Sequence, residues 1–445
     1  MDFREMTAAE QGRAIGEGKA CPVDLAESYL EAAAAHPDGA RIYARLTPER
    51  ARAEAMAARG RAKAGTRRGL LDGVSLSWKD LFDSAEVATE SGSRLLEGRV
   101  PETDAEVLAT ATLGGGVCLG KTHMTELAFS GLGINPMTAT PPNAVVPHLA
   151  PGGSSSGAAV SVALGLAAGA VGSDTGGSVR IPAAWNDLVG LKTTHGRVSL
   201  KGAVPLCAKF DTVGPLARSV EDCALILSLI EGRAAPDLAG ASLTSARLLV
   251  LEGLPMEGAR AEPLRGFEQA VEALGRAGAK IERRALKMVD PAMALSPTLF
   301  APEAYGLWMD EIEAAPEKMY APILERFRGG ATVRAADYVA GWAALERYRQ
   351  AWNAAVAGYD AVLVPTAPIL PPDAARLLSD SAYFAQENLL ALRNTRIGNI
   401  FGLCALTLPT GLPCTGISLM GQPGGEHALL RLGAAVEPVL RALAN

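Results

Sequence analysis

The sequence has no excess of basic residues and no long apolar run. Its 445 residues carry a formal net charge of −6. Nucleic acids and anionic membranes attract a positively charged face, so we expect neither as a direct partner. The longest apolar stretch, residues 158–172 ("AAVSVALGLAAGAVG"), is shorter than the ~20 residues that a membrane span requires. We therefore interpret this stretch as a tightly packed core element.

The cysteines are few and scattered. They form no CxxC pair, and no histidine stands at zinc-ligand spacing from them, which argues against a metal site and against a disulfide framework. The N-terminal stretch "MDFREMTAAEQGRAIGEGKA" lacks the apolar core of a signal peptide, so the sequence predicts a cytoplasmic protein. We expect buried, reduced thiols at Cys21, Cys118, Cys207, Cys223, Cys404 and Cys414.

Helical and strand-like patterns alternate along the chain, which indicates one α/β domain with a helical insertion. An Ala-rich helix in "DAEVLATATLGGG" is expected to begin at an N-cap formed by Thr103 or Asp104. Helical spacing covers residues 5–35, 47–64, 261–277, 426–443 and most of 300–358. Strands are expected in "VCLGKT", "AGAVGSD", "ARLLVLEGL", "AKIERRAL", "YDAVLVPTAPI", "LCALTLPTG" and "GISLMGQ".

Residues 115–122 ("GGVCLGKT") match the P-loop pattern of nucleotide-binding proteins. Phosphate binding by this motif requires a strand, then a flexible loop, then a helix. Here the glycines follow a helical segment, and the middle residues suit a buried strand. We therefore expect a core strand with Lys121 at its exit, and nucleotide binding is a remote alternative.

Gly153, Ser155 and Gly157 match a second pattern, the G-x-S-x-G elbow of α/β-hydrolases. The elbow must follow a strand, whereas the upstream segment "NAVVPHLAPGG" contains two prolines and a histidine. A Ser-Asp-His order also needs a later histidine, and only His195 and His427 follow. The elbow interpretation is therefore disfavoured.

Three separated segments carry a more consistent chemistry. "GVSLSWKD" places Lys79 at the end of an apolar strand, "PGGSSSG" (151–157) supplies hydroxyls, and "GSDTGGSVRIPAA" supplies Ser178 after two glycines. A serine hydroxyl is a weak nucleophile that needs a base within hydrogen-bond reach. A lysine of ordinary pKa, near ~10.4, is protonated at pH 7, so burial among apolar residues must lower its pKa.

Two observations bear on this chemistry in opposite ways. Asp80 and Asp83 would oppose the lowering of the Lys79 pKa if they faced it, and Lys79 alone could be a surface lysine paired with Asp83. "DTGGS" supplies consecutive backbone N–H groups that could hold an oxyanion, because glycine lets the backbone approach a substrate closely. The alternative for this segment is a tight strand-to-helix turn that binds no ligand.

Together these segments resemble the amidase signature family of Ser-Ser-Lys amide hydrolases. The resemblance extends over most of the chain and includes "GKTHMTELAFSGLGINP" and "LCALTLPTGLP". It implies an α/β fold with a central mixed β-sheet covered by helices on both faces. The implied single domain spans residues 1–445, with a helical N-terminal layer (1–65), a catalytic core (70–230), a βα unit with a helical insertion near the substrate pocket (235–360), and C-terminal strands and a helix (361–445).

The resemblance also implies residue roles. Ser178 corresponds to the nucleophile, Ser154 to a bridging serine that follows a cis peptide bond from Gly153, and Lys79 to the base. The N–H groups of Thr175, Gly176, Gly177 and Ser178 correspond to the oxyanion hole.

The supporting residues are less specific. Ser155 or Ser156 could cap the small-residue helix that follows, or Ser155 could orient Ser154 or Ser178. We expect Asp174 and Arg180 to brace the nucleophile turn. His123 stands where the family commonly has asparagine and is expected to tune the pocket, and Thr193 stands where proline is common.

The implied function is hydrolysis of a carbon–nitrogen bond other than a peptide bond. A small-molecule carboxylic amide would be converted to an acid and ammonia or an amine through a seryl acyl-enzyme, without cofactor or metal. The aromatic-bearing helices of residues 300–345 are expected to wall the pocket. The alternatives are the glutaminase (A-type) subunit of a tRNA-dependent amidotransferase, which needs partner subunits, and a family member without activity. A homodimer is compatible with the sequence.

Overall fold

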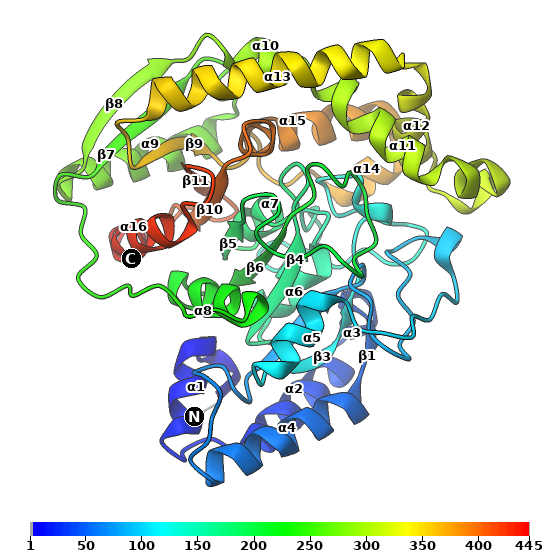
Figure 1. Cartoon of the computed structure of the whole chain (residues 1–445), viewed down its shortest axis with the longest axis vertical. Helices are drawn as coiled ribbons and strands as arrows, with labels where there is room; N and C mark the ends of the chain where they lie inside the picture. The colour runs from blue at the N-terminus through cyan, green and yellow to red at the C-terminus, as the bar shows by residue number, and fades with distance from the viewer. Residues whose placement is uncertain (1–2, 445) are drawn as a thin grey trace.

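One sheet collects strands from the whole length of the chain (Figure 1). The computed structural model describes residues 3–444. Their strands form an 11-stranded sheet in the order β1-β3-β2-β4-β6-β5-β10-β11-β9-β7-β8. The strands are β1 (Tyr43–Leu46), β2 (Ser75–Lys79), β3 (Val117–Thr122), β4 (Gly169–Ser173), β5 (Val189–Lys192), β6 (Val213–Ala217), β7 (Arg247–Glu252), β8 (Lys280–Ala285), β9 (Ala361–Pro365), β10 (Cys404–Pro409) and β11 (Gly416–Gly421).

The sheet is mixed, as the resemblance implies. β3, β2 and β4 run parallel to one another, as do β9, β7 and β8. The strands between these groups, β4-β6-β5-β10-β11-β9, pair antiparallel. The two parallel groups are therefore joined through an antiparallel centre.

Helices cover both faces of this sheet. In β4, a Cβ at Gly169 would meet Ile226 of α8, whereas a Cβ at Gly172 would meet Ser155 at the start of α6. Residues three apart in a strand point to opposite faces, so α8 and α6 lie on opposite sides. α16 packs against α8, and α7 packs with α6. These helices are α6 (Ser156–Ala163), α7 (Arg180–Trp185), α8 (Val220–Glu231) and α16 (Glu426–Arg441).

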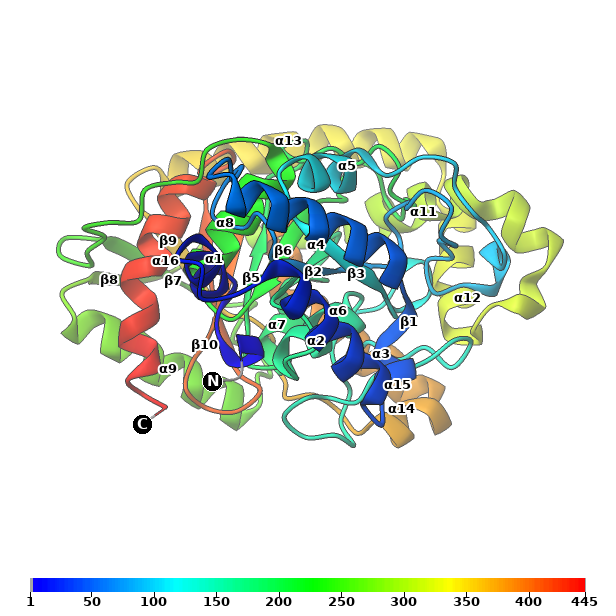
Figure 2. The ribbon, with the colours of Figure 1, turned by 90° about the horizontal axis from the view of Figure 1, so that it is seen from below.

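The N-terminal helices form a layer at one end of the long axis (Figure 1). α2 and α4 lie side by side, and both contact β3 (Figure 2). The predicted helices of residues 5–35 and 47–64 are confirmed, although β1 was not predicted within this layer. The elements are α1 (Ala8–Gly16), α2 (Pro22–Ala35), α3 (Gly39–Ile42), α4 (Pro48–Lys63) and α5 (Glu106–Leu113).

The later helices lie at the opposite end of the molecule, where α13 forms its upper edge (Figure 1). The predicted helices of 261–277 and 300–358 are confirmed, whereas α14 and α15 were not predicted. The elements are α9 (Ala261–Arg276), α10 (Val289–Met293), α11 (Ser296–Ala314), α12 (Ala321–Arg328), α13 (Ala335–Val356), α14 (Ala374–Ser379) and α15 (Ser381–Ile400).

One helix start was predicted wrongly. The N-cap of α5 is Ala105, which makes no side-chain cap hydrogen bond, rather than Thr103 or Asp104. The Asp104 carboxylate instead accepts hydrogen bonds from Arg50, at 2.7 and 2.8 Å, and from the Ala85 N–H. Because the Asp104 carboxylate is bonded to Arg50, it does not cap α5.

Two sequence-based expectations about the whole chain can also be compared with the structure. All six cysteines are free thiols, and five of them are buried; Cys21 is partly buried. Within residues 3–444, no helix combines the length and hydrophobicity that a bilayer crossing would need.

Candidate active site

Two neighbouring parallel strands bring the predicted base and the predicted nucleophile turn to the same edge of the sheet. β2 ends at Lys79, β4 ends at Ser173, and the "DTGGS" turn follows immediately. Because β2 and β4 run parallel, their carboxyl ends meet. Lys79 Nζ lies 2.6 Å from Ser154 Oγ and 2.8 Å from Ser173 Oγ.

Lys79 has no exposed surface. Burial lowers the pKa of Lys79 to about 7, against the opposing charges of Asp174 and Asp211. A substantial fraction of this amine is therefore neutral near pH 7, as a base requires.

The acidic residues that follow Lys79 do not face it. Asp80 binds Arg45 at 2.9 Å, and Asp83 binds Arg99 at 2.7 Å. The alternative of a surface lysine paired with Asp83 is therefore wrong.

The loop "PGGSSSG" presents its three hydroxyls in three directions. The Gly153–Ser154 peptide bond is cis, as the resemblance implies. Ser154 Oγ accepts from Lys79, whereas Ser155 Oγ donates to the Ser173 carbonyl at 3.2 Å. Ser156 Oγ donates to the His123 carbonyl at 3.3 Å. Ser155 occupies the N-cap position of α6 without a side-chain cap hydrogen bond, so the alternative in which a serine caps this helix is wrong. The Ser155 hydroxyl instead donates to the backbone carbonyl at the end of β4.

A buried ion pair holds the turn after β4. The Arg180 guanidinium lies 2.9 Å from the Asp174 carboxylate, and neither side chain is exposed. Burial raises the pKa of Asp174, but Arg180 opposes this strongly enough to bring that pKa to about 2. Asp174 also accepts from the N–H groups of Gly177 and Val179, while Arg180 donates to the Thr395 carbonyl on α15. This arrangement fixes the turn against α15.

Ser178 lies at the wall of a cavity of about 370 Å³. Its carbonyl accepts from the Ser155 N–H at 3.2 Å. Its hydroxyl makes no hydrogen bond within residues 3–444. Ser154 forms a hydrogen bond with Lys79, but no hydrogen bond joins the side chains of Ser178 and Ser154.

The expected oxyanion donors divide into two groups. The Gly177 N–H, expected in the oxyanion hole, is already committed to Asp174 at 2.8 Å. Within the described chain, the N–H groups of Thr175, Gly176 and Ser178 have no acceptor. These residues line the cavity, so their N–H groups are the expected oxyanion donors that the protein itself leaves unoccupied.

The second glycine of the turn is needed for its conformation. Gly177 has a φ of +141°, and a Cβ at this position would lie 2.1 Å from Thr395 Oγ1. A side chain would therefore push the turn away from α15.

The cavity is walled by segments distant in sequence. Residues 128–130 precede the serine loop, Leu206 follows β5, and the other walls belong to the turn after β4, to α11, α12 and α15, and to Gly329, Thr332 and Val333. Phe300 is the aromatic residue from the segment 300–345 that reaches this cavity. Its ring stacks on Phe210, with centroids 4.0 Å apart.

The other predicted features lie elsewhere. Lys121 is buried within β3, where it donates to Thr89 Oγ1 at 2.8 Å and lies 3.4 Å from Asp80. The P-loop alternative is therefore wrong, because a buried strand replaces the phosphate loop. The His123 side chain, which was expected to tune the pocket, does not line the cavity beside Ser178, and burial lowers its pKa to about 4. Thr193 Oγ1 donates to the Val213 carbonyl on β6 at 2.7 Å.

Sequence reasoning missed three polar residues around this centre. Ser173 bonds Lys79, Asn399 bonds Asp174 at 2.9 Å, and Asp211 accepts from Thr175 Oγ1 at 2.5 Å. Ser173 immediately precedes "DTGGS", which could have signalled it. Asn399 and Asp211 reach the centre only through the fold.

Comparison with known proteins identifies the family. The Amidase family model matches residues 24–430. The 2-amino-5-chloromuconic acid deaminase of Comamonas testosteroni is 32% identical over 450 residues, covering 99% of this chain and 97% of that protein. The A-type component of the glutamyl-tRNA(Gln) amidotransferase of Anaeromyxobacter sp. (strain K) is 31% identical over 481 residues, covering 98% and 96%.

Solved structures agree. A crystal structure described as an amidase superposes with a TM-score of 0.85 and 31% identity, covering 98% of this chain and 99% of that one. The native peptide amidase of Stenotrophomonas maltophilia superposes with a TM-score of 0.83 and 28% identity, covering 99% and 98%. The chain belongs to the Amidase family and is an amide hydrolase.

Proposed function

We propose that the chain hydrolyses a small-molecule carboxylic amide with Ser178 as nucleophile, Ser154 as proton relay and Lys79 as base. The observation that carries this proposal is the 2.6 Å hydrogen bond between Lys79 and Ser154 in a buried site that lowers the pKa of the lysine to about 7. A lysine in this state accepts a proton near neutral pH.

The proposed reaction proceeds in two halves. Ser178 Oγ attacks the amide carbon while its proton passes to Ser154, and the Ser154 proton passes to Lys79. The tetrahedral oxyanion is stabilised by the N–H groups of Thr175, Gly176 and Ser178. The carbon–nitrogen bond then breaks as Ser154 protonates the leaving nitrogen and recovers a proton from Lys79. Ammonia or an amine leaves, and an acyl ester remains on Ser178.

Water completes the turnover. It attacks the ester carbon and loses a proton through Ser154 to Lys79. The acid leaves as Ser178 Oγ regains a proton by the reverse relay. In this scheme Ser173 and the Asp174–Arg180 pair position the reacting groups. The relay requires Ser178 Oγ to approach Ser154 Oγ once substrate is bound.

The test is ammonia release by the purified chain from a panel of primary amides. We expect hydrolysis by the chain alone, and we expect Ser178→Ala to abolish it without loss of the fold. Hydrolysis that persists in Ser178→Ala contradicts the assignment of the nucleophile.

A second candidate is the glutaminase component of a tRNA-dependent amidotransferase. It is favoured by the 31% identity to the A-type component of such an amidotransferase over 98% of this chain. This candidate predicts that glutamine is hydrolysed only when partner subunits are added, whereas our main proposal predicts turnover without them. A cytoplasmic location and a homodimer also remain predictions.

A further inference from the structure

Two arginines line the proposed catalytic cavity. Arg326 comes from α12 and Arg396 from α15, and both share the cavity wall with Ser178. A Cβ at Gly176 would lie 4.0 Å from Arg396 Nε, which places this guanidinium beside the proposed oxyanion turn. Both side chains are only partly accessible to solvent.

Neither guanidinium has an anionic partner in the part of the chain that the structure describes. No hydrogen bond or ion pair to either group occurs within residues 3–444, and Arg326 Nε is buried without an acceptor. Arg326 packs over the ring of Phe129, 4.5 Å from its centroid. Glu325 is the only carboxylate among the described lining residues; it is exposed and forms no ion pair with Arg326 or Arg396.

Both arginines have lowered pKa values, as expected for buried cations without a nearby anion. Burial, together with the like charge of Arg396, lowers the pKa of Arg326 to about 9. Burial lowers the pKa of Arg396 to about 10. A guanidinium withdrawn from water without a counter-ion is unfavourable, and an anion between the two groups would relieve both penalties.

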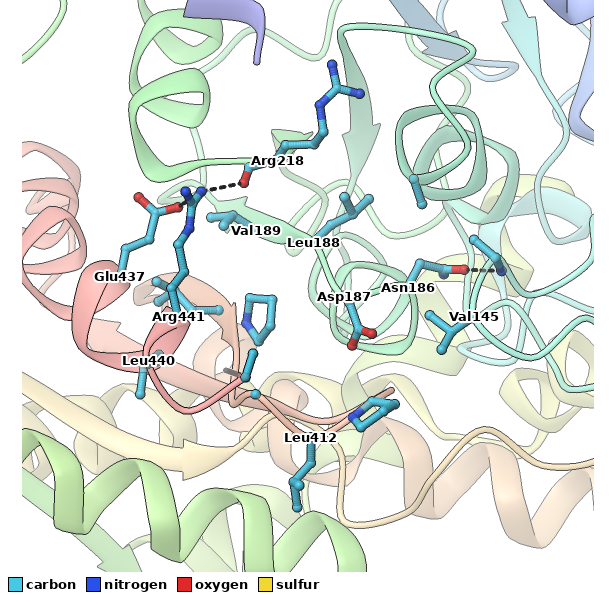
Figure 3. A pocket seen from close by; sticks show the side chains of 17 residues that line it. Val145, Asn186, Asp187, Leu188, Val189, Arg218, Leu412, Glu437, Leu440 and Arg441 are labelled. Carbon is cyan, nitrogen blue, oxygen red and sulfur yellow. Dashed lines mark hydrogen bonds and ion pairs between the residues drawn. The ribbon is translucent and has the colours of Figure 1, made fainter. Parts of the chain in front are cut away.

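The arginines beside another cavity of this molecule have hydrogen-bond partners in the protein, although Arg218 Nε is buried without an acceptor. That second cavity, of about 550 Å³, lies beside α16 and contains none of the proposed catalytic residues (Figure 3). There Arg441 donates to Glu437 and to the Arg218 carbonyl, and Arg218 donates to the Met6 and Val162 carbonyls. Arg326 and Arg396 differ because neither guanidinium has any hydrogen-bond or ion-pair partner within residues 3–444.

We propose that the substrate is an amide that also carries a carboxylate, and that Arg326 and Arg396 bind this carboxylate while Ser178 attacks the amide. Guanidinium groups bind carboxylates through planar, charge-assisted hydrogen bonds. A cavity of about 370 Å³ suits a small molecule of this kind. The inference rests on the proposed function, since it assigns the substrate class of the same site.

The test compares amides that differ only in charge. Succinamate is paired with levulinamide, in which a methyl ketone replaces the carboxylate, and glutaramate is paired with 5-oxohexanamide. We expect kcat/KM to be at least about tenfold higher for the carboxylate-bearing member of a pair. Arg326→Gln and Arg396→Gln should each raise its KM by roughly tenfold to a hundredfold, with the neutral amide changed by no more than about twofold.

Two further variants separate charge recognition from structural damage. Arg326→Lys keeps the charge and should recover part of the lost affinity. Arg328→Gln is the matched control, because Arg328 lies on the same helix but is exposed and paired with Glu313. Arg328→Gln should leave kcat/KM unchanged for both amides of each pair.

The outcomes distinguish this inference from the function on which it rests. Equal hydrolysis of charged and neutral amides, with a ratio that neither arginine variant moves, overturns the carboxylate site and leaves the amidase mechanism standing. Where no pair is hydrolysed, calorimetry decides. Binding of succinamate or glutaramate to the Ser178→Ala protein that is lost on adding Arg326→Gln upholds the site, and absence of binding overturns it.

Discussion

Lys79 and Ser154 are joined by a 2.6 Å hydrogen bond, and neither side chain has any surface exposed to solvent. Burial destabilises the ammonium form of the lysine and so favours the neutral amine. The same hydrogen bond places that amine where it can exchange a proton with the Ser154 hydroxyl. This relationship is the basis of the predictions that follow.

Replacing Lys79 by methionine should lower kcat by about 10²- to 10⁴-fold, because it removes the base but keeps the length of an apolar side chain. The fold should persist, since no carboxylate within residues 3–444 forms an ion pair with Lys79. Ammonia release and thermal unfolding measured on the same preparation check both points. Lys201→Met, at an exposed lysine, is the matched control and should retain activity. Wild-type rates in Lys79→Met would remove the base from the mechanism.

The pH dependence should reflect the titration of Lys79. Its active form is the neutral amine, and its pKa is about 7. Activity is therefore present above pH 7 and falls towards tenfold per pH unit below it. A profile of log kcat/KM against pH, measured with an uncharged amide, should bend near 7. A profile that stays flat between pH 5.5 and 8.5 would contradict a lysine base with this pKa.

Ser173 should tune the base without taking part in the chemistry. It accepts a 2.8 Å hydrogen bond from Lys79, and loss of an acceptor destabilises the ammonium form. Ser173→Ala should therefore move the bend in the pH profile to lower pH and reduce kcat modestly. Ser173→Thr keeps the hydroxyl and should restore the wild-type bend. An unchanged profile in Ser173→Ala would show that this contact does not act on Lys79.

Arg180→Met should destabilise the protein by about 3–5 kcal/mol, because it leaves the Asp174 carboxylate buried and unpaired. Denaturant unfolding measures this loss, and activity should fall as the nucleophile turn loosens. Arg334→Met is the control, because the Arg334–Asp337 pair lies at the surface. A similar change in both variants would mean that the buried pair contributes nothing particular to the turn.

The proposed catalytic residues could be proposed from the sequence because they lie in three short segments with restrictive composition. Lys79 ends an apolar strand, and the glycines around Ser154 and Ser178 permit backbone conformations that few residues adopt. The polar groups that complete the centre could not be predicted in this way. Asn399 lies more than two hundred residues beyond Asp174, and only the packing of α15 brings them together.

Fold elements escaped prediction where burial removed the usual periodicity. α15 buries residues around most of its circumference, so it shows no apolar stripe. β5 and β6 have four and five residues and contain glycine or proline, which are weak strand signals. Arg326 and Arg396 line the same cavity because the fold brings α12 and α15 together. No local sequence pattern predicts that these two helices meet.

Labelling with a fluorophosphonate, followed by peptide mass spectrometry, tests the central claim most directly. The account predicts one stoichiometric adduct on Ser178, and it predicts that Lys79→Met slows labelling strongly. An adduct on Ser155 or Ser154 in place of Ser178, or labelling at an unchanged rate in Lys79→Met, would contradict it.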